Sequence, residues 1–175
     1  ELSKWKDIVT VKTWINTLEN SRSVRALEMY VNGNKIVGSE TFWAVFNTEI
    51  RRPEALALPF EHFELYPENK ATDKTFSKIN LNNDTEMIFE KTVVLSDLDI
   101  VNHVNNVKYL EWCLDFVNEK LILKQKIESF EMNFLKELSL KDKVVIHENL
   151  TSDTMIFSIT KEEKTCFALQ LNLNI

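Results

Sequence analysis

Glycine and proline are scarce in this chain of 175 residues, which contains two glycines and three prolines. This composition excludes a collagen-like protein and a low-complexity disordered one. It also excludes a glycine-rich phosphate-binding loop, because such a loop needs several glycines close together. With 44% hydrophobic and 27% charged residues, the chain is long enough to bury a sizeable core in one or two domains.

Cysteine and histidine are also rare, with two and three copies. Cys113 and Cys166 each lie in an apolar pattern without metal-ligand spacing, so we interpret both as reduced core residues of a cytoplasmic protein rather than as a disulfide. The histidines, His62, His103 and His147, show no paired ligand spacing. No metal site is therefore expected.

Long hydrophobic runs and an excess of positive charge are missing too. No apolar run approaches the ~18 residues that a membrane-spanning helix needs, and no signal peptide is visible. The formal net charge of -6 argues against nucleic acid as a main partner, because phosphate binding needs a basic face. The sequence therefore predicts neither a membrane nor a nucleic acid as a partner. An anionic ligand remains compatible with this charge, since a local patch can differ in sign from the whole.

The first 50 residues predict antiparallel strands. Residues 7–15 set apolar side chains among polar ones, residues 23–31 alternate two sets of side chains, and residues 35–47 form a longer third candidate. The Asn-Gly pair at residues 32–33 indicates a hairpin turn, because these residues accept positive φ. Residues 51–85 are polar and hold all three prolines, which is typical of a linker that runs over a surface.

Residues 86–175 predict a different arrangement. A strand over Met87–Leu95 precedes one long amphipathic helix from Asn105 to Leu123, with Asn105 or Asn106 as the N-cap. Four further strand candidates follow, at residues 127–138, 142–151, 154–162 and 164–175. This order suits the hot-dog fold, an α+β arrangement in which a curved antiparallel sheet wraps a long helix.

The stretch SDLDIVNHVNNVKYLEW, residues 96–112, places a histidine and two aspartates just ahead of the predicted helix. Free N–H groups and the positive dipole end at a helix start favour negative charge, including the oxyanion formed when a carbonyl is attacked. His103 lies two residues before the predicted N-cap, and Asp99 could orient its ring or position a water. These residues suit ester or thioester hydrolysis, although capping and turn formation are their commoner roles.

The same stretch resembles the motif of acyl-ACP thioesterases, the double hot-dog hydrolases that release fatty acids from acyl carrier protein. The matching residues are Asp99, His103, Val104, Asn105, Asn106, Lys108, Tyr109 and Trp112. The segments VKTW, ETFWAVFNTEIRRP and MNFLKELSLKD resemble the family in the same order, so the resemblance covers nearly the whole chain. It implies a tandem hot dog whose first half, residues 1–50, shows no leading strand or helix. Either these elements precede residue 1, which is the preferred interpretation, or the protein is truncated. Residues 51–85 would be the linker, and residues 86–175 the C-terminal hot dog that carries the catalytic residues.

The resemblance also implies a mechanism, in which activated water hydrolyses the thioester during fatty acid biosynthesis without a metal or cofactor. It assigns the activation of water to Glu137, with His103 oriented by Asp99 or sharing the proton transfer. A nucleophilic cysteine, proposed for some members beside that glutamate, has no counterpart because Leu138 stands there. Attack by water is therefore the preferred hypothesis.

One position departs from the family pattern. The family's asparagine two residues after the aspartate falls on Val101, whose side chain can neither donate to a carbonyl nor hold a water. The neighbouring Asn102 would replace it if the backbone shifts locally. Val101 favours one alternative to an acyl-ACP hydrolase, a non-catalytic relative that binds acyl groups or acyl carrier protein. A second alternative, which differs only in the carrier, is an acyl-CoA thioesterase of the same fold.

The remaining predicted site residues concern the substrate. Asn105 and Asn106 lie at the helix start, and Trp43 could line an acyl tunnel. Arg51 and Arg52 could dock the acidic carrier protein, since the surface of this chain that binds an acidic partner must be basic. The alternatives are capping for the asparagines, ordinary core packing for the tryptophan and solvated loop charge for the arginines. Hot-dog proteins often pair, so a homodimer is one expected state.

Overall fold

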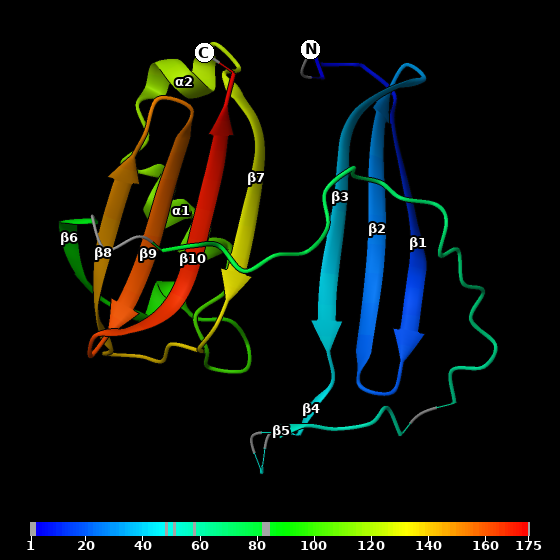
Figure 1. The fold of residues 1–175 in the computed structure, drawn as a ribbon, viewed down its shortest axis with the longest axis horizontal. Helices are drawn as coiled ribbons and strands as arrows, with labels where there is room; N and C mark the ends of the chain where they lie inside the picture. Colours follow the sequence, from blue (N-terminus) through cyan, green and yellow to red (C-terminus); the bar gives the residue numbers. More distant parts are fainter. Residues whose placement is uncertain (1–2, 48, 51, 58, 82–84, 175) are drawn as a thin grey trace. The chain divides into compact units, whose positions relative to one another are not determined.

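The structure is a computed structural model that describes residues 3–47, 49–50, 52–57, 59–81 and 85–174. The chain divides into two compact units, Glu1–Phe76 and Ser77–Ile175, and each contains its own antiparallel sheet (Figure 1). None of the helices formed by the described residues is long and apolar enough to cross a membrane.

The N-terminal unit is built on a three-stranded sheet in the order β1-β2-β3. Its strands are β1 (Val9–Glu19), β2 (Arg22–Val31) and β3 (Asn34–Ala44), followed by the short pair β4 (Phe46–Asn47) and β5 (Arg52–Pro53). The predicted hairpin turn is confirmed, because Asn32 and Gly33 between β2 and β3 have φ values of 50° and 85°. The described residues of this unit contain no helix.

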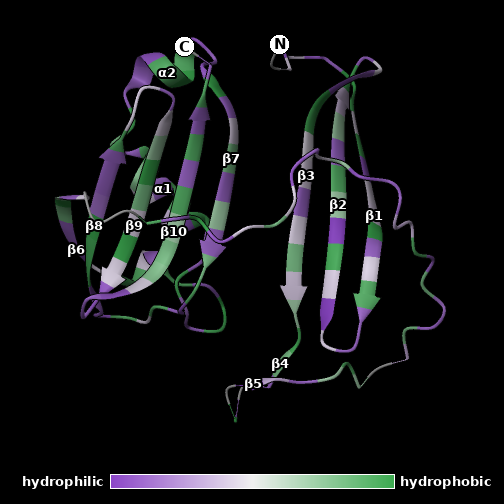
Figure 2. Cartoon of the chain, in the orientation of Figure 1, coloured by the Kyte–Doolittle hydropathy of each residue, from purple (hydrophilic) through white to green (hydrophobic). Residues whose placement is uncertain are grey.

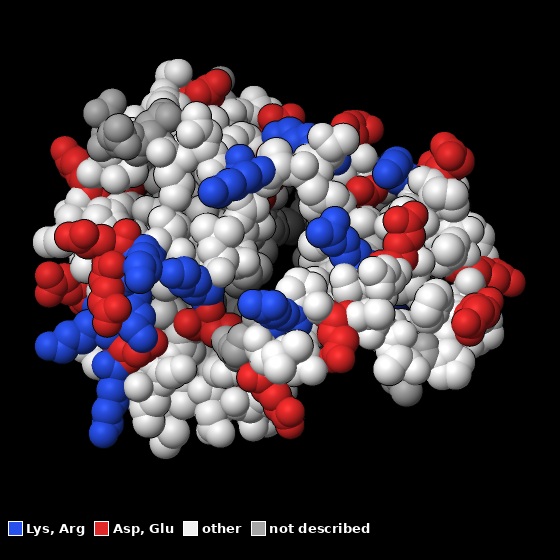
Figure 3. All heavy atoms as spheres, turned by 60° about the horizontal axis from the view of Figure 1, so that its bottom comes forward, with Lys and Arg blue, Asp and Glu red and all other residues white. Residues whose placement is uncertain are grey.

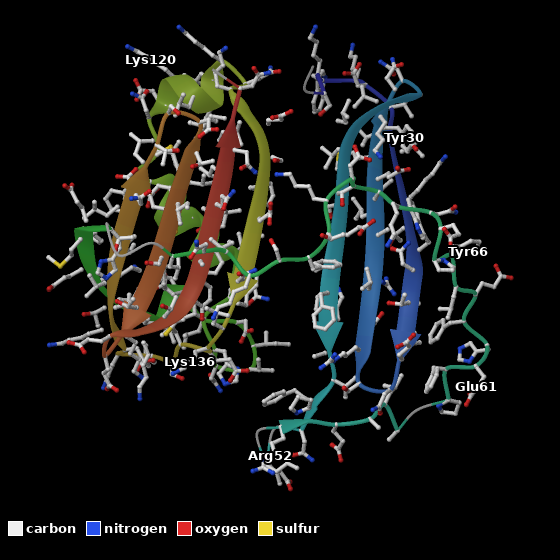
Figure 4. All side chains as sticks on the ribbon, viewed as in Figure 1. Tyr30, Arg52, Glu61, Tyr66, Lys120 and Lys136 are labelled. Carbon is white, nitrogen blue, oxygen red and sulfur yellow. The ribbon has the colours of Figure 1, made fainter. Side chains whose placement is uncertain are left out.

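Part of the predicted linker packs on this sheet. Asn16, which is buried in β1, donates its side-chain amide to the carbonyl oxygens of Tyr66 at 2.9 Å and Asn69 at 2.7 Å. The segment approaches β3 so closely that a Cβ on Gly38 would lie 2.1 Å from the carbonyl oxygen of Ala71, which explains the glycine. Figure 4 shows Tyr66 on the segment that runs beside β1.

The C-terminal unit has a five-stranded antiparallel sheet in the order β6-β8-β9-β10-β7. The strands are β6 (Glu86–Thr92), β7 (Ile127–Phe134), β8 (Lys143–Leu150), β9 (Thr154–Lys161) and β10 (Lys164–Leu173). A single 3-10 turn, η1 (Leu95–Asp97), follows β6 and leads toward helix α1 (Asn106–Leu114). The sheet curves around this helix (Figure 1), as the sequence predicts.

The helical segment differs from its prediction. One helix from Asn105 to Leu123 was expected, but α1 ends at Leu114 and a second helix, α2, spans Glu119–Leu123. The side chain of Asn118 caps α2 by accepting the Lys120 N–H at 2.9 Å. The prediction of one long helix is wrong because the apolar periodicity continues through Val117, which is buried in the core although the backbone there is no longer helical.

The core of this unit lies between α1 and the sheet. Tyr109, Trp112 and Cys113 are the buried residues of α1, and they join buried side chains of β8, β9 and β10 in one cluster. Along β10, hydrophobic and hydrophilic bands alternate (Figure 2), as expected for a strand with one face on the core. Cys113 and Cys166 are buried and free, as predicted. Burial raises the pKa of Cys113 to about 12, so this thiol stays protonated.

Candidate active site

His103 lies in a tight loop between η1 and α1, and Asp99 organises that loop. Oδ1 of Asp99 accepts the backbone N–H of Val101 at 2.9 Å and that of His103 at 3.2 Å. The Asp99 N–H in turn donates to the carbonyl oxygen of His103 at 2.8 Å. Asp99 therefore fixes the backbone from which the His103 side chain leaves the loop.

The two residues in the middle of the loop are explained by its backbone. Asn102 has φ 65°, in the left-handed region that asparagine tolerates better than branched residues. This conformation accounts for an asparagine at residue 102 without a catalytic role. Val101 precedes it with 61% of its surface exposed, so its side chain is not part of the core.

Asn105 ends the loop and begins the helix. Its side chain accepts the Val107 N–H at 3.0 Å, which confirms it as the N-cap, and Asn106 is the first residue of α1. The amide group of Asn105 keeps its N–H donors at the positive end of the helix dipole. This end of α1 can therefore stabilise an anion.

A second segment brings Glu137 to the loop. The N–H of Val104 donates to the carbonyl oxygen of Leu138 at 2.9 Å, and His103 forms an isolated bridge with Ser139. As a result, Nε2 of His103 lies 3.6 Å from Oε2 of Glu137. Figure 4 shows Lys136, the residue before Glu137, at the lower end of the sheet.

The paired side chains remain open to solvent. The His103 side chain is 34% exposed and that of Glu137 is 47% exposed, so water can reach both. Their separation is longer than a direct hydrogen bond but short enough for one charge to stabilise the other. A partly exposed imidazole and carboxylate beside a helix N-terminus are suited to taking a proton from water next to a developing oxyanion.

The other predicted substrate residues belong to the N-terminal unit, and their roles stay predictions. Trp43, in β3, is 56% exposed, and Arg52 lies exposed in β5 (Figure 4). Arg51 lies outside the described residues. Over the face drawn in Figure 3, Lys and Arg side chains lie among Asp and Glu side chains rather than in a patch of one sign.

The sequence did not reveal the role of Asp97. This buried carboxylate accepts the Val94 N–H at 2.9 Å and pairs with Lys91 at 3.4 Å, while Nζ of Lys91 lies 4.9 Å from the centre of the Trp112 ring. The backbone carbonyl of Asp97 also accepts the N–H of Asn105 at 2.9 Å. Asp97 therefore ties the loop that carries His103 to the core. In the sequence, the spacing of three residues between Val94 and Asp97 was the signal for this contact, because a carboxylate at that spacing can accept the backbone N–H at the start of a helical turn.

No group of three or more His, Cys, Asp or Glu side chains that could hold a metal ion occurs among the described residues.

The matching family model and the similar curated proteins indicate one family. Residues 71–174 match the family model described as the acyl-ACP thioesterase C-terminal domain. A chloroplastic palmitoyl-acyl carrier protein thioesterase of Arabidopsis thaliana is 26% identical over 161 residues, which cover 86% of this chain and 38% of the relative. Oleoyl-acyl carrier protein thioesterase 2 of the same plant is 24% identical over 163 residues, with coverages of 86% and 44%. The chain thus spans about two fifths of the length of these curated relatives.

Solved structures show the same fold. An acyl-ACP thioesterase from Bacteroides thetaiotaomicron matches with a TM-score of 0.84 and 21% identity, covering 96% of this chain and 69% of that one. The 12:0-ACP thioesterase from Umbellularia californica matches with a TM-score of 0.80 and 20% identity, covering 98% and 70%. These likenesses confirm the predicted hot-dog fold.

Proposed function

The chain belongs to the acyl-ACP thioesterase family, and from this premise we propose that it hydrolyses the thioester between a fatty acyl group and acyl carrier protein, in fatty acid biosynthesis. The observation that carries the proposal is the 3.6 Å approach of Glu137 to His103 beside the N-terminus of α1. The sequence neighbours are thioesterases of acyl carrier protein by name, which supports the choice of substrate class.

In the proposed reaction, Glu137 and His103 are the catalytic residues and water is the nucleophile. The pair takes a proton from a water molecule as its oxygen attacks the thioester carbonyl carbon. The negative charge that develops on the carbonyl oxygen faces the start of α1, where the N-terminal dipole and the Asn105 amide favour it. Collapse of this intermediate breaks the C–S bond, and the departing sulfur receives the proton. The products are a fatty acid and the free thiol of the carrier.

The remaining assigned residues position groups rather than react. Asp99 holds the loop backbone around His103, and Asn102 provides the left-handed residue that the loop needs. Asn105 and Asn106 bind the carbonyl end of the substrate in this proposal. Trp43 would contact the acyl chain, and Arg51 and Arg52 would contact the carrier protein.

Comparison of carriers tests the proposal. The chain is incubated with one acyl group loaded either on acyl carrier protein or on coenzyme A, over a range of chain lengths, and thiol release is followed. Faster release from the carrier protein is expected. Faster release from coenzyme A would favour the acyl-CoA thioesterase. Tight binding of acylated carrier protein without release would favour the non-catalytic relative, which the apolar Val101 supports.

Val101 gives a separate prediction. We expect Val101→Asn to raise kcat by about tenfold, because it returns an amide donor to a site where one donor to an oxyanion has an effect of this size or larger. Val101→Ala is the matched control, since it removes the branched group without adding a donor. Steady-state thiol release is measured for both variants. Equal rates for the two variants would mean that the amide is not what the site lacks.

Location and assembly remain predictions. The plant relatives are named as chloroplastic, whereas the sequence of this chain predicted a cytoplasmic protein. A homodimer is proposed on the general tendency of hot-dog proteins to pair.

A further inference from the structure

Tyr109 is held rigidly in the core of the C-terminal unit. It lies on α1, three residues after Asn106, and only 2% of its surface is exposed. Its ring centre lies 5.7 Å from that of Trp112, 5.7 Å from that of Phe134 and 5.3 Å from that of Phe167. Because three aromatic rings surround it, the position of its hydroxyl group is fixed by packing.

That hydroxyl contacts the segment that carries Glu137. The N–H of Leu138 donates to the Tyr109 hydroxyl oxygen at 3.1 Å in a buried hydrogen bond. The carbonyl of the same residue accepts the Val104 N–H at 2.9 Å. The residue after Glu137 is therefore held on one side by helix α1 and on the other by the loop of His103.

Glu137 is held through its backbone neighbours. Lys136 donates its N–H to the carbonyl oxygen of Cys166 at 3.0 Å, and Leu138 makes the two bonds just described. Glu137 itself lies beyond the end of β7, outside any strand, and its side chain is 47% exposed. The proposed reaction requires its carboxylate to stay beside His103. Building on the proposed function, we infer that Tyr109 is a positioning residue, whose hydroxyl holds the Leu138 N–H and thereby keeps Glu137 beside His103.

The acid-base properties of Tyr109 agree with this role. Burial raises its pKa to about 12, and the nearby Glu137 carboxylate also raises it. The hydroxyl therefore stays protonated wherever the hydrolysis is assayed, and it takes no proton from water. It acts through its hydrogen bond alone.

The test replaces the hydroxyl and keeps the ring. We expect Tyr109→Phe to lower kcat about tenfold and to change KM less than about twofold, because the lost hydrogen bond displaces Glu137 but removes no substrate contact. In a Glu137→Gln background the same substitution should have no further effect on kcat, since the group it positions is already gone. Tyr30→Phe is the matched control. It removes a tyrosine hydroxyl that donates to Glu28 at 2.5 Å in the N-terminal unit, and kcat should not change.

A merely structural role would give a different result. An equal fall in kcat in both backgrounds, or a rise in KM at unchanged kcat, would overturn the inference. The melting temperature of each variant is recorded, so that loss of folded protein is separated from loss of rate.

A measurement without substrate separates this inference from the proposed function. By NMR, the ring resonances of His103 should move in the same direction in Tyr109→Phe and Glu137→Gln, and the Leu138 amide should exchange with solvent faster in Tyr109→Phe. Unchanged His103 resonances in Tyr109→Phe would overturn the inference even if the chain proves to be a thioesterase. If no thioester is hydrolysed but the resonances move as expected, the proposed function fails and the positioning role stands.

Discussion

Glu137→Gln is expected to lower kcat for acyl-ACP hydrolysis by about 10²- to 10⁴-fold, the usual contribution of general acid-base catalysis. Glutamine keeps the size of the side chain but cannot accept a proton from water at neutral pH. In the unsubstituted chain, Oε2 of the Glu137 carboxylate lies 3.6 Å from Nε2 of His103. Thiol release at saturating acylated carrier protein measures the change, and KM reports whether substrate binding is preserved.

Glu128→Gln is the control for this prediction. Glu128 is an exposed glutamate in β7, in the same unit, so its substitution makes the same change in charge outside the site. Its kcat should equal that of the unsubstituted chain. A Glu137→Gln variant with undiminished kcat would show that water is activated by another group.

Phe167→Ala should destabilise the C-terminal unit strongly, by about 3–5 kcal/mol of its free energy of unfolding. Phe167 is fully buried in β10, and its ring centre lies 5.3 Å from that of Tyr109 and 5.1 Å from that of Phe134. Truncation leaves a cavity next to the tyrosine that contacts the Glu137 segment. Urea unfolding is followed by fluorescence in a background with Trp5→Phe, Trp14→Phe and Trp43→Phe, so that the signal comes from Trp112, which lies in the same core.

Phe130→Ala makes the same truncation at a phenylalanine of β7 that is 52% exposed. It should cost less than about 1 kcal/mol, because a half-exposed ring leaves no closed cavity. Similar losses for the two variants would mean that the core is not packed around Phe167.

The strands were predictable because their pattern is local. Apolar residues set among polar ones marked β1 and β2, short candidate segments marked β7 to β10, and the Asn-Gly pair marked the β2–β3 turn. The break between α1 and α2 was not predictable from periodicity. Val117 keeps the helical spacing while it packs in the core from a non-helical backbone. The sequence signal for the break is the pair of polar residues on either side of it, Asp115 and Asn118, since both residue types favour helix ends.

The candidate site depends on contacts that no local pattern specifies. The backbone hydrogen bond between Val104 and Leu138 and the bridge between His103 and Ser139 bring His103 and Glu137 together. Only the family resemblance linked these two side chains beforehand. The resemblance also matched Tyr109, but the bond from the Leu138 N–H to its hydroxyl appears only once the helix is packed on the sheet. Side-chain contacts between distant segments follow from the fold rather than from spacing.

We propose that this chain cleaves acyl thioesters with His103 and Glu137. The most direct test is thiol release from acyl carrier protein loaded with a range of acyl chains, measured for the unsubstituted chain, His103→Ala and His147→Ala. His147 is the matched control, because its ring contacts the hydroxyl of Thr160 at 3.1 Å on the sheet and lies outside the site. We predict release by the unsubstituted chain and by His147→Ala, and a loss of at least about 10²-fold in His103→Ala. Equal release by all three would show that His103 takes no part in the reaction, and binding of acylated carrier protein with no release by any of them would show that the chain is not a thioesterase.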